Sequence, residues 1–322
     1  MCYIDDMIKP SKLNVIYGGD CLDYLRDNLC LPDESVDLII TSPPYADRRR
    51  SSYGGIHPGK YVEWFLPISQ QLFRVLKPTG SFILNIKENV RNGERETYVI
   101  ELILALRKQG WLWTEEYCWY KKNSYPGKWP NRFRDSWERC LHFTKQKKFK
   151  MYQDAVKVPI GEWAKQRFKS MTEKDFIRHI SGTNSKFARN VSHWLNRKKV
   201  YPHNVLVFEK EHYIKPTTLI HFATECSNRN HSAAFPIELP SWFIKLFTKK
   251  DDVVLDPFIG VGTTAMAAML LKRRYIGIEM SGEYAKTAKT NIKELEKIIY
   301  PKKRESNPKD NNRQNLEALT SF

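Results

Sequence analysis

A Thr-Ser-Pro-Pro-Tyr segment at residues 41–45 combines groups that can hold and orient an amine. Pro43 and Pro44 each lock their own φ and restrict the residue before them, so the Ser42 hydroxyl and the Pro43 carbonyl keep fixed directions. These two oxygens can accept both hydrogens of an exocyclic amine on a nucleobase, whose lone pair is delocalised into its ring. Tyr45 can stack on a base swung out of a duplex, because this nitrogen cannot be reached inside the stack. The alternative is a plain tight turn with an anchoring aromatic residue.

A second candidate site is a glycine-containing loop that begins at Asp256, directly after an apolar run, and reads Asp-Pro-Phe-Ile-Gly-Val-Gly-Thr. Gly260 and Gly262 allow a tight turn and a close approach of the backbone to a ligand. Thr263 or Thr264 can cap the helix that follows. An ordinary strand-turn-helix connection is the alternative.

The next apolar run ends at Glu279, nineteen residues after Gly260. A carboxylate placed there can accept hydrogen bonds from ribose hydroxyls, as in the nucleotide-binding crevices of doubly wound sheets. The loop lacks the third glycine of the dinucleotide fingerprint, since residue 265 is Ala, and the chain has no GxxxxGK[ST] motif. These features favour an adenosyl ligand over a pyrophosphate.

Short apolar, β-branched runs that end at turns alternate with helix-like segments along the chain. The expected strands cover residues 14–17, 36–40, 81–86, 253–255 and 275–278. The expected helices include residues 61–76, 96–109 and 263–272. Alternating strands and helices predict an α/β fold, a doubly wound and mostly parallel sheet covered on both faces.

Charge is concentrated in one part of the chain. The formal net charge is +17, and residues 145–229 hold 18 Lys or Arg and 7 Asp or Glu, a net +11. The same segment has few strand signals and interleaves its basic residues with aromatic ones. This pattern indicates a basic insertion that binds a polyanion such as nucleic acid, with a merely solvated surface as the alternative.

Other features exclude several classes of protein. The six cysteines form no CxxC pair and give no disulfide framework, which is typical of a reducing cytoplasm. No apolar run reaches 18 residues, and the first residues do not resemble a signal peptide, so we expect neither a membrane span nor secretion. The eight histidines lack metal-ligand spacing, and we expect no metal site.

Together, the two motifs resemble those of the amino-methylating DNA methyltransferases of bacterial restriction-modification systems. The order, with TSPPY before DPFxGxGT, is similar to the permuted class, and the resemblance covers residues 12–295. It implies a Rossmann-like fold that binds S-adenosyl-L-methionine. In that family TSPPY is the catalytic motif, and DPFxGxGT is the loop at the methionine side of the cofactor, matched here by Asp256, Phe258, Gly260 and Gly262.

The resemblance also assigns the remaining cofactor residues. Glu279 matches the acid that binds the ribose, and Asp20, after Gly19, is similar to the acid that contacts the adenine. The stretch His-Ser-Ala-Ala-Phe-Pro at residues 231–236 looks like a helix-start motif beside the methionine end, with Ser232 in place of the usual proline. The expected cofactor-binding set is Asp20, His231, Phe235, Asp256, Phe258, Gly260, Gly262, Thr263 and Glu279.

Four segments follow from this organisation. We expect residues 12–144 to form the catalytic half, 145–230 the target-recognition region, 231–296 the cofactor-binding half and 297–322 a flexible tail. Residues 77–86 are similar to the family's next core strand, and residues 119–137 to the loop and strand that flank the target base. Expected contacts to DNA come from Arg48, Arg49, Arg50, Trp129, Arg132, Arg197, Lys198 and Lys199.

The expected partner is double-stranded DNA, with a restriction nuclease acting on the same site without a stable complex. A serine before the two prolines is typical of enzymes that methylate cytosine N4, whereas aspartate is typical of adenine N6 enzymes, so we favour N4. Adenine N6 stays the first alternative, and an RNA or protein amine methyltransferase the second. Methylation of cytosine C5 is disfavoured because no cysteine follows a proline. A non-enzymatic DNA-binding protein would leave both motifs without a role.

Overall fold

The computed structural model describes residues 13–47, 55–122, 130–172, 175, 177–179, 188–190, 196–208 and 235–300. The chain divides into two compact units: residues 1–152 together with 204–322, and residues 153–203. The larger unit therefore includes residues 145–152 and 204–208, which we had predicted to lie in the target-recognition region.

An eight-stranded sheet forms the centre of the larger unit. Its spatial order is β1-β14-β13-β2-β3-β7-β6-β12. The strands are β1 (Val15–Gly18), β2 (Val36–Thr41), β3 (Leu76–Ile86), β6 (Leu112–Tyr120), β7 (Trp137–Thr144), β12 (Val205–Leu206), β13 (Val253–Asp256) and β14 (Arg274–Glu279). The first five in spatial order are parallel, and β7 is antiparallel to both β3 and β6. The expectation of a mostly parallel α/β sheet is confirmed.

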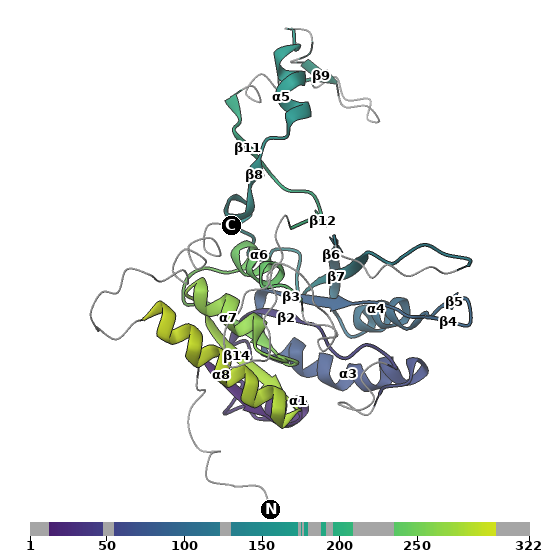
Figure 1. Cartoon of the computed structure of the whole chain (residues 1–322), viewed down its shortest axis with the longest axis vertical. Coiled ribbons are helices and arrows are strands. Elements are labelled where there is room, and N and C mark those ends of the chain that lie inside the picture. Colours follow the sequence, from purple (N-terminus) through teal and green to yellow (C-terminus); the bar gives the residue numbers. More distant parts are fainter. Residues whose placement is uncertain are drawn as a thin grey trace, which may run out of the picture. The chain divides into compact units, whose positions relative to one another are not determined.

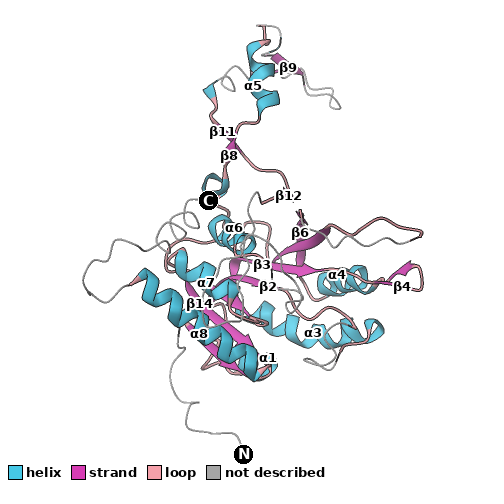
Figure 2. Ribbon diagram, in the orientation of Figure 1, coloured by secondary structure: helices cyan, strands magenta, loops and turns pink. Residues whose placement is uncertain are grey.

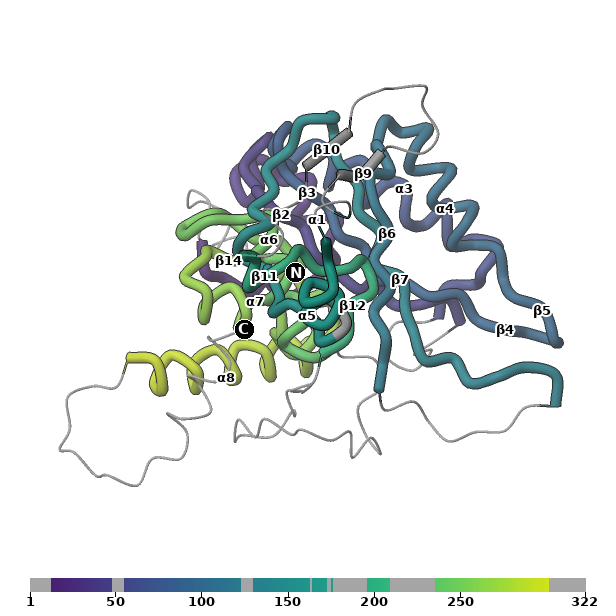
Figure 3. Tube along the Cα trace, turned by 90° about the horizontal axis from the view of Figure 1, so that it is seen from above, coloured from purple at the N-terminus to yellow at the C-terminus, as the bar shows by residue number. Residues whose placement is uncertain are grey.

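Helices cover both faces of this sheet (Figures 1 and 2). They are α1 (Cys21–Arg26), α3 (Pro58–Val75), α4 (Tyr98–Lys108), α6 (Glu238–Phe247), α7 (Thr263–Leu270) and α8 (Gly282–Ile299). Helix α3 packs against α1 and α4, and α7 packs against α6 and α8, which gives one layer on each side. Figure 3 shows α3 and α4 side by side. All six residues of β2 are buried, as expected for a central strand between two helical layers.

Several element boundaries differ from those predicted. Strand β3 begins at Leu76, five residues before the predicted start, and α3 ends at Val75 instead of continuing through residue 76. Helix α8 continues to Ile299, three residues into the predicted tail. The amphipathic pattern of α8 accounts for this extension, because its apolar side packs on β1 and β14. Residues 301–322 lie outside the described part.

The smaller unit consists of short elements. These are a 3-10 turn (Gln153–Val156), β8 (Val158–Pro159), α5 (Glu162–Lys169), β9 (Ile177–His179), β10 (Ala188–Asn190) and β11 (Lys199–Val200). Strand β8 pairs with β11 and β9 with β10, both antiparallel. A hairpin of β4 (Val90–Arg91) and β5 (Glu94–Arg95) belongs to the larger unit. Within the described part of the chain, no helix is long and apolar enough to cross a membrane.

Candidate active site

The two motifs lie at neighbouring strand ends, although more than 200 residues separate them in the sequence. Strands β2 and β13 are parallel neighbours, with Ile39 paired to Leu255. The Thr41 hydroxyl, at the end of β2, donates a hydrogen bond of 2.6 Å to Oδ1 of Asp256 at the end of β13. Both side chains are buried. The diproline segment and the glycine loop therefore start from the same edge of the sheet, where doubly wound folds bind ligands.

Asp256 accepts three hydrogen bonds, of which the one from Thr41 joins the two motifs. Besides Thr41, it accepts from the Phe258 amide at 3.0 Å and from the Thr264 hydroxyl at 2.6 Å. Burial raises its pKa to about 6 against the effect of these donors, and the negative charge of Glu279 acts in the same direction as burial. The Asp256 carboxyl group therefore stabilises the first turn of the glycine loop and holds it against the end of β2.

The expectation that Thr263 or Thr264 caps the following helix is wrong. The N-cap of α7 is Gly262, which adopts a left-handed conformation with φ of 96° and offers no side-chain cap. The Thr264 hydroxyl is directed to Asp256 instead, because a buried carboxylate needs donors.

The glycines of the loop behave as the motif predicts. Gly260 and Gly262 both have positive φ. A Cβ on Gly262 would lie 3.2 Å from the Cβ of Ala288, so a side chain there would push helix α8 away by a few tenths of an ångström. A Cβ on Gly260 would meet no atom within 4 Å, which leaves open space beside its backbone. A ligand can approach Gly260 closely.

Glu279 lies beside this open space. Its Oε2 accepts from the Gly260 amide at 2.8 Å and its Oε1 accepts from the Ser281 amide at 2.9 Å. Each carboxylate oxygen can accept more than one hydrogen bond, so ribose hydroxyls can share the group. The Gly19 amide donates to the Glu279 carbonyl at 2.9 Å, and Asp20, which caps α1, has an exposed side chain. These acidic and glycine residues fit the adenosine part of an adenosyl ligand.

Tyr45 is held at its hydroxyl by a polar network behind the diproline segment. The hydroxyl lies 2.8 Å from Oε2 of Glu138 and 3.2 Å from Oδ1 of Asn85, and the Ser42 hydroxyl donates to it at 3.5 Å. Glu138, at the start of β7, also forms an ion pair with Lys121. Asn85 comes from the end of β3. Three neighbouring strands thus fix the position of the aromatic ring.

This network has a defined ionisation state. Burial acts to raise the pKa of Glu138, but the charge of Lys121 and hydrogen bonds from Lys121 and Tyr45 bring it below its usual value. Burial and the charge of Glu138 raise the pKa of Tyr45 well above its ordinary value. Tyr45 is therefore a neutral donor to a carboxylate. Sequence reasoning missed Glu138, Asn85 and Lys121. The signals that could have found two of them were the polar Asn85 between Leu84 and Ile86 in an apolar run, and the charged pair Glu138-Arg139 at the start of β7.

The structure places the other predicted residues as follows. Phe235 is buried just before α6, and the ring of Phe258 packs against Trp64 with centroids 5.8 Å apart. Arg132 forms an ion pair of 3.2 Å with Asp135. Arg197, Lys198 and Lys199 are exposed on the smaller unit. Arg48, Arg49, Arg50, Trp129 and His231 lie outside the described residues.

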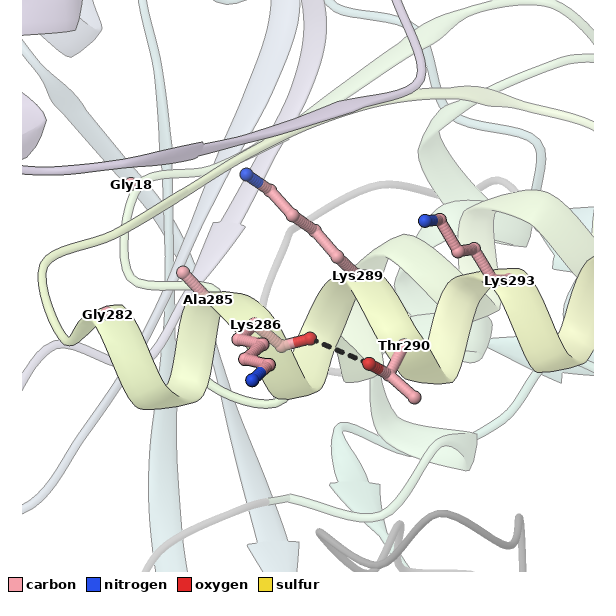
Figure 4. Close-up of a pocket in the computed structure, with 7 residues that line it drawn as sticks. All are labelled: Gly18, Gly282, Ala285, Lys286, Lys289, Thr290 and Lys293. Atoms are coloured by element: carbon pink, nitrogen blue, oxygen red, sulfur yellow. Dashed lines mark hydrogen bonds between the residues drawn. The ribbon is translucent and has the colours of Figure 1, made fainter.

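A hollow of about 480 Å³ opens between the end of β1 and helix α8 (Figure 4). Its lining is basic and contains none of the residues predicted to bind the cofactor. The lining residues are Gly18, Gly282, Ala285, Lys286, Lys289, Thr290 and Lys293. Among the described residues, no group of three or more His, Cys, Asp or Glu is arranged to hold a metal ion.

The sheet, the glycine loop and its acidic partner define a Rossmann-like fold with a candidate site for an adenosyl ligand. The family model for DNA methylases that act on N6 or N4 matches residues 36–290, and the chain belongs to this family. Its cofactor is S-adenosyl-L-methionine.

Individual relatives agree with this assignment. The chain is 27% identical over 281 residues to the Type II methyltransferase M.PvuII of Proteus hauseri, covering 84% of this chain and 80% of the relative. It is also 27% identical to M.BglII of Bacillus subtilis, covering 89% and 71%. The solved structure titled PvuII DNA methyltransferase (cytosine-N4-specific) has a similar fold, with a TM-score of 0.61, 22% identity and coverage of 97% of this chain and 92% of that one.

Proposed function

We propose that this DNA methylase transfers a methyl group from S-adenosyl-L-methionine to the exocyclic N4 of cytosine in duplex DNA, at a specific sequence, in the bacterial cytoplasm. The observation that carries the proposal is the hydrogen bond from Thr41 to Asp256, which joins the diproline segment to the glycine loop. An amine held at Ser42 then lies next to a ligand held at the loop.

The residues divide the work between binding and orientation. Glu279 and Asp20 hold the ribose and adenine, and the loop from Asp256 to Gly262 holds the methionine side together with Phe235 and His231. The bound cofactor supplies a methyl group that is already activated by its sulfonium. The protein mainly positions the amine against this methyl group. Correct positioning of two reactants can account for a large part of the rate acceleration of an enzyme.

At the other side of the site, the Ser42 Oγ and the Pro43 carbonyl accept the two amino hydrogens of the base. This geometry turns the nitrogen lone pair toward the methyl donor. The Tyr45 ring stacks on the extruded base, with its hydroxyl fixed by Glu138. Ser42 is a hydrogen-bond acceptor here and not a nucleophile. The proton of the product amine leaves to water or to a weak acceptor.

Two observations support cytosine N4 over adenine N6. The residue before the prolines is Ser42, which is typical of N4 enzymes, and the relative with a similar fold is titled cytosine-N4-specific. Adenine N6 remains the alternative, because both bases offer an amine to the same acceptors. An RNA or protein amine is the second alternative.

The basic segment of residues 145–230 would recognise the DNA sequence, with Arg197, Lys198 and Lys199 on the phosphate backbone. A restriction nuclease that cuts the same sequence would act separately, without a stable complex. Both assignments come from the pattern of charge and from the family.

The test is methyl transfer from labelled cofactor to DNA, RNA and protein, followed by nucleoside mass analysis and mapping of the modified sites. The proposal predicts N4-methylcytosine in duplex DNA at one sequence. N6-methyladenine would establish the first alternative, and label in RNA or protein alone would establish the second.

A further inference from the structure

Phe133 is the most exposed large hydrophobic side chain in the described part of the chain, with 96% of its surface accessible. It lies in the connection between β6 and β7, and the neighbouring Arg134 is also exposed. An aromatic ring in water contributes no burial to folding, so the stability of the fold does not account for its position.

The backbone next to Phe133 is held in place. Asp135 accepts a hydrogen bond of 2.8 Å from Arg95 and forms ion pairs with Arg132 at 3.2 Å and with Lys87 at 3.8 Å. The Lys121 amide donates to the Ser136 carbonyl at 2.6 Å. The residues that follow Phe133 are therefore anchored to the ends of neighbouring strands.

The base of this loop lies at the active site. Lys87, which follows the end of β3, donates to the Trp137 carbonyl at 2.9 Å. Glu138, the next residue, binds the Tyr45 hydroxyl. Phe133 is five residues from Glu138, and a chain of that length spans at most about 18 Å. The exposed ring is thus tied to the edge of the sheet at which the target base would be bound.

We propose that Phe133 inserts into the duplex at the position that the extruded base leaves, with Arg134 on an adjacent phosphate. This inference rests on the proposed function, since it requires a flipped base. An apolar wedge between base steps is a known way to hold a deformed duplex, and an aromatic ring can stack on every base. A guanidinium beside the ring fits the phosphates on each side of such a gap.

The test compares the Phe133→Ala variant with the native protein on two duplexes that carry the mapped target sequence. In one duplex the target cytosine is paired with guanine, and in the other it faces an abasic position and is already unpaired. We expect Phe133→Ala to lower kcat/KM about 10-fold to 100-fold on the paired duplex and by less than about 3-fold on the other. Phe133→Trp should keep most of the activity.

The matched control is Tyr300→Ala, because Tyr300 is another exposed aromatic residue, 67% accessible, at the end of α8. The Tyr300→Ala variant should methylate both duplexes with the native kcat/KM. The proposed insertion of Phe133 would be overturned if Phe133→Ala had normal activity on the paired duplex, or if it lost activity equally on both duplexes. Either result would leave the proposed methylase function intact. A native protein that forms no N4-methylcytosine in any duplex DNA, so that no target sequence can be mapped, would instead overturn the proposed function itself.

Discussion

The Tyr45 hydroxyl shows how a single buried carboxylate can set the position of an aromatic ring. A neutral phenol that donates to an ionised Glu138 forms a charge-assisted hydrogen bond, which is stronger than a bond to a neutral acceptor. Lys121 keeps that carboxylate ionised in a buried place. In the proposed function Glu138 is therefore a positioning residue, which would act on the base through Tyr45.

We expect Glu138→Gln to lower kcat about 10-fold with little change in the KM for S-adenosyl-L-methionine, since only the ring position is disturbed. The measurement is steady-state methylation of DNA. Glu116→Gln is the control, because Glu116 pairs with Arg139 on the same pair of strands without touching Tyr45.

A double-mutant comparison separates positioning from general damage. When Tyr45 is replaced by Phe, the hydroxyl is gone, and Glu138→Gln should then add little further loss. Equal losses in the two backgrounds would mean that Glu138 acts by another route.

At the scale of elements, the turn from β13 into α7 depends on a glycine for two reasons. Gly262 has positive φ, and α8 closes over it at Ala288. We expect Gly262→Ala to reduce the free energy of unfolding by about 1–3 kcal/mol and to weaken cofactor binding, because the loop must move away from α8.

Thermal unfolding and calorimetric titration with S-adenosyl-L-methionine measure these two effects. Gly282→Ala is the matched control, since Gly282 lies in the first turn of α8, without positive φ, and a Cβ there meets open space. If both variants bind the cofactor like the native protein, the loop does not hold it.

The parallel strands and the two motifs at their ends could be predicted because each is a local pattern. A run of apolar, β-branched residues predicts a strand, and the turn residues that follow it predict where the strand ends. The Tyr45–Glu138 contact could not be predicted in this way, because 93 residues separate its partners and they meet only through the pairing of β3 with both β2 and β7. The predicted capping of α7 failed for a local reason, since the Thr264 hydroxyl donates to Asp256, eight residues earlier, and Gly262 takes the N-cap position.

At the scale of the whole molecule, the net charge of +17 predicts DNA affinity that depends on salt. The logarithm of the affinity should fall linearly with the logarithm of the salt concentration. Replacing Arg197, Lys198 and Lys199 together with Ala should reduce the slope by roughly one for each DNA phosphate that these side chains neutralise.

Fluorescence anisotropy with a labelled duplex gives this slope. The matched control replaces three other basic residues with Ala. They are Lys286, Lys289 and Lys293, which line the hollow on α8 (Figure 4). If only the replacement of the α8 lysines changes the slope, the DNA lies along α8, and the smaller unit does not contact the DNA phosphates.

The most direct test of the account is the rate of a single turnover by Ser42→Ala at saturating S-adenosyl-L-methionine, with cofactor affinity measured on the same sample. The account predicts a rate about 10-fold to 100-fold lower, because the variant lacks one of the two acceptors for the amine, and an affinity within about two-fold of the native value. Asp256→Ala should show the reverse primary effect, weaker cofactor binding, because Asp256 holds the loop. A Ser42→Ala protein that methylates DNA at the native rate would contradict the assignment of the active site.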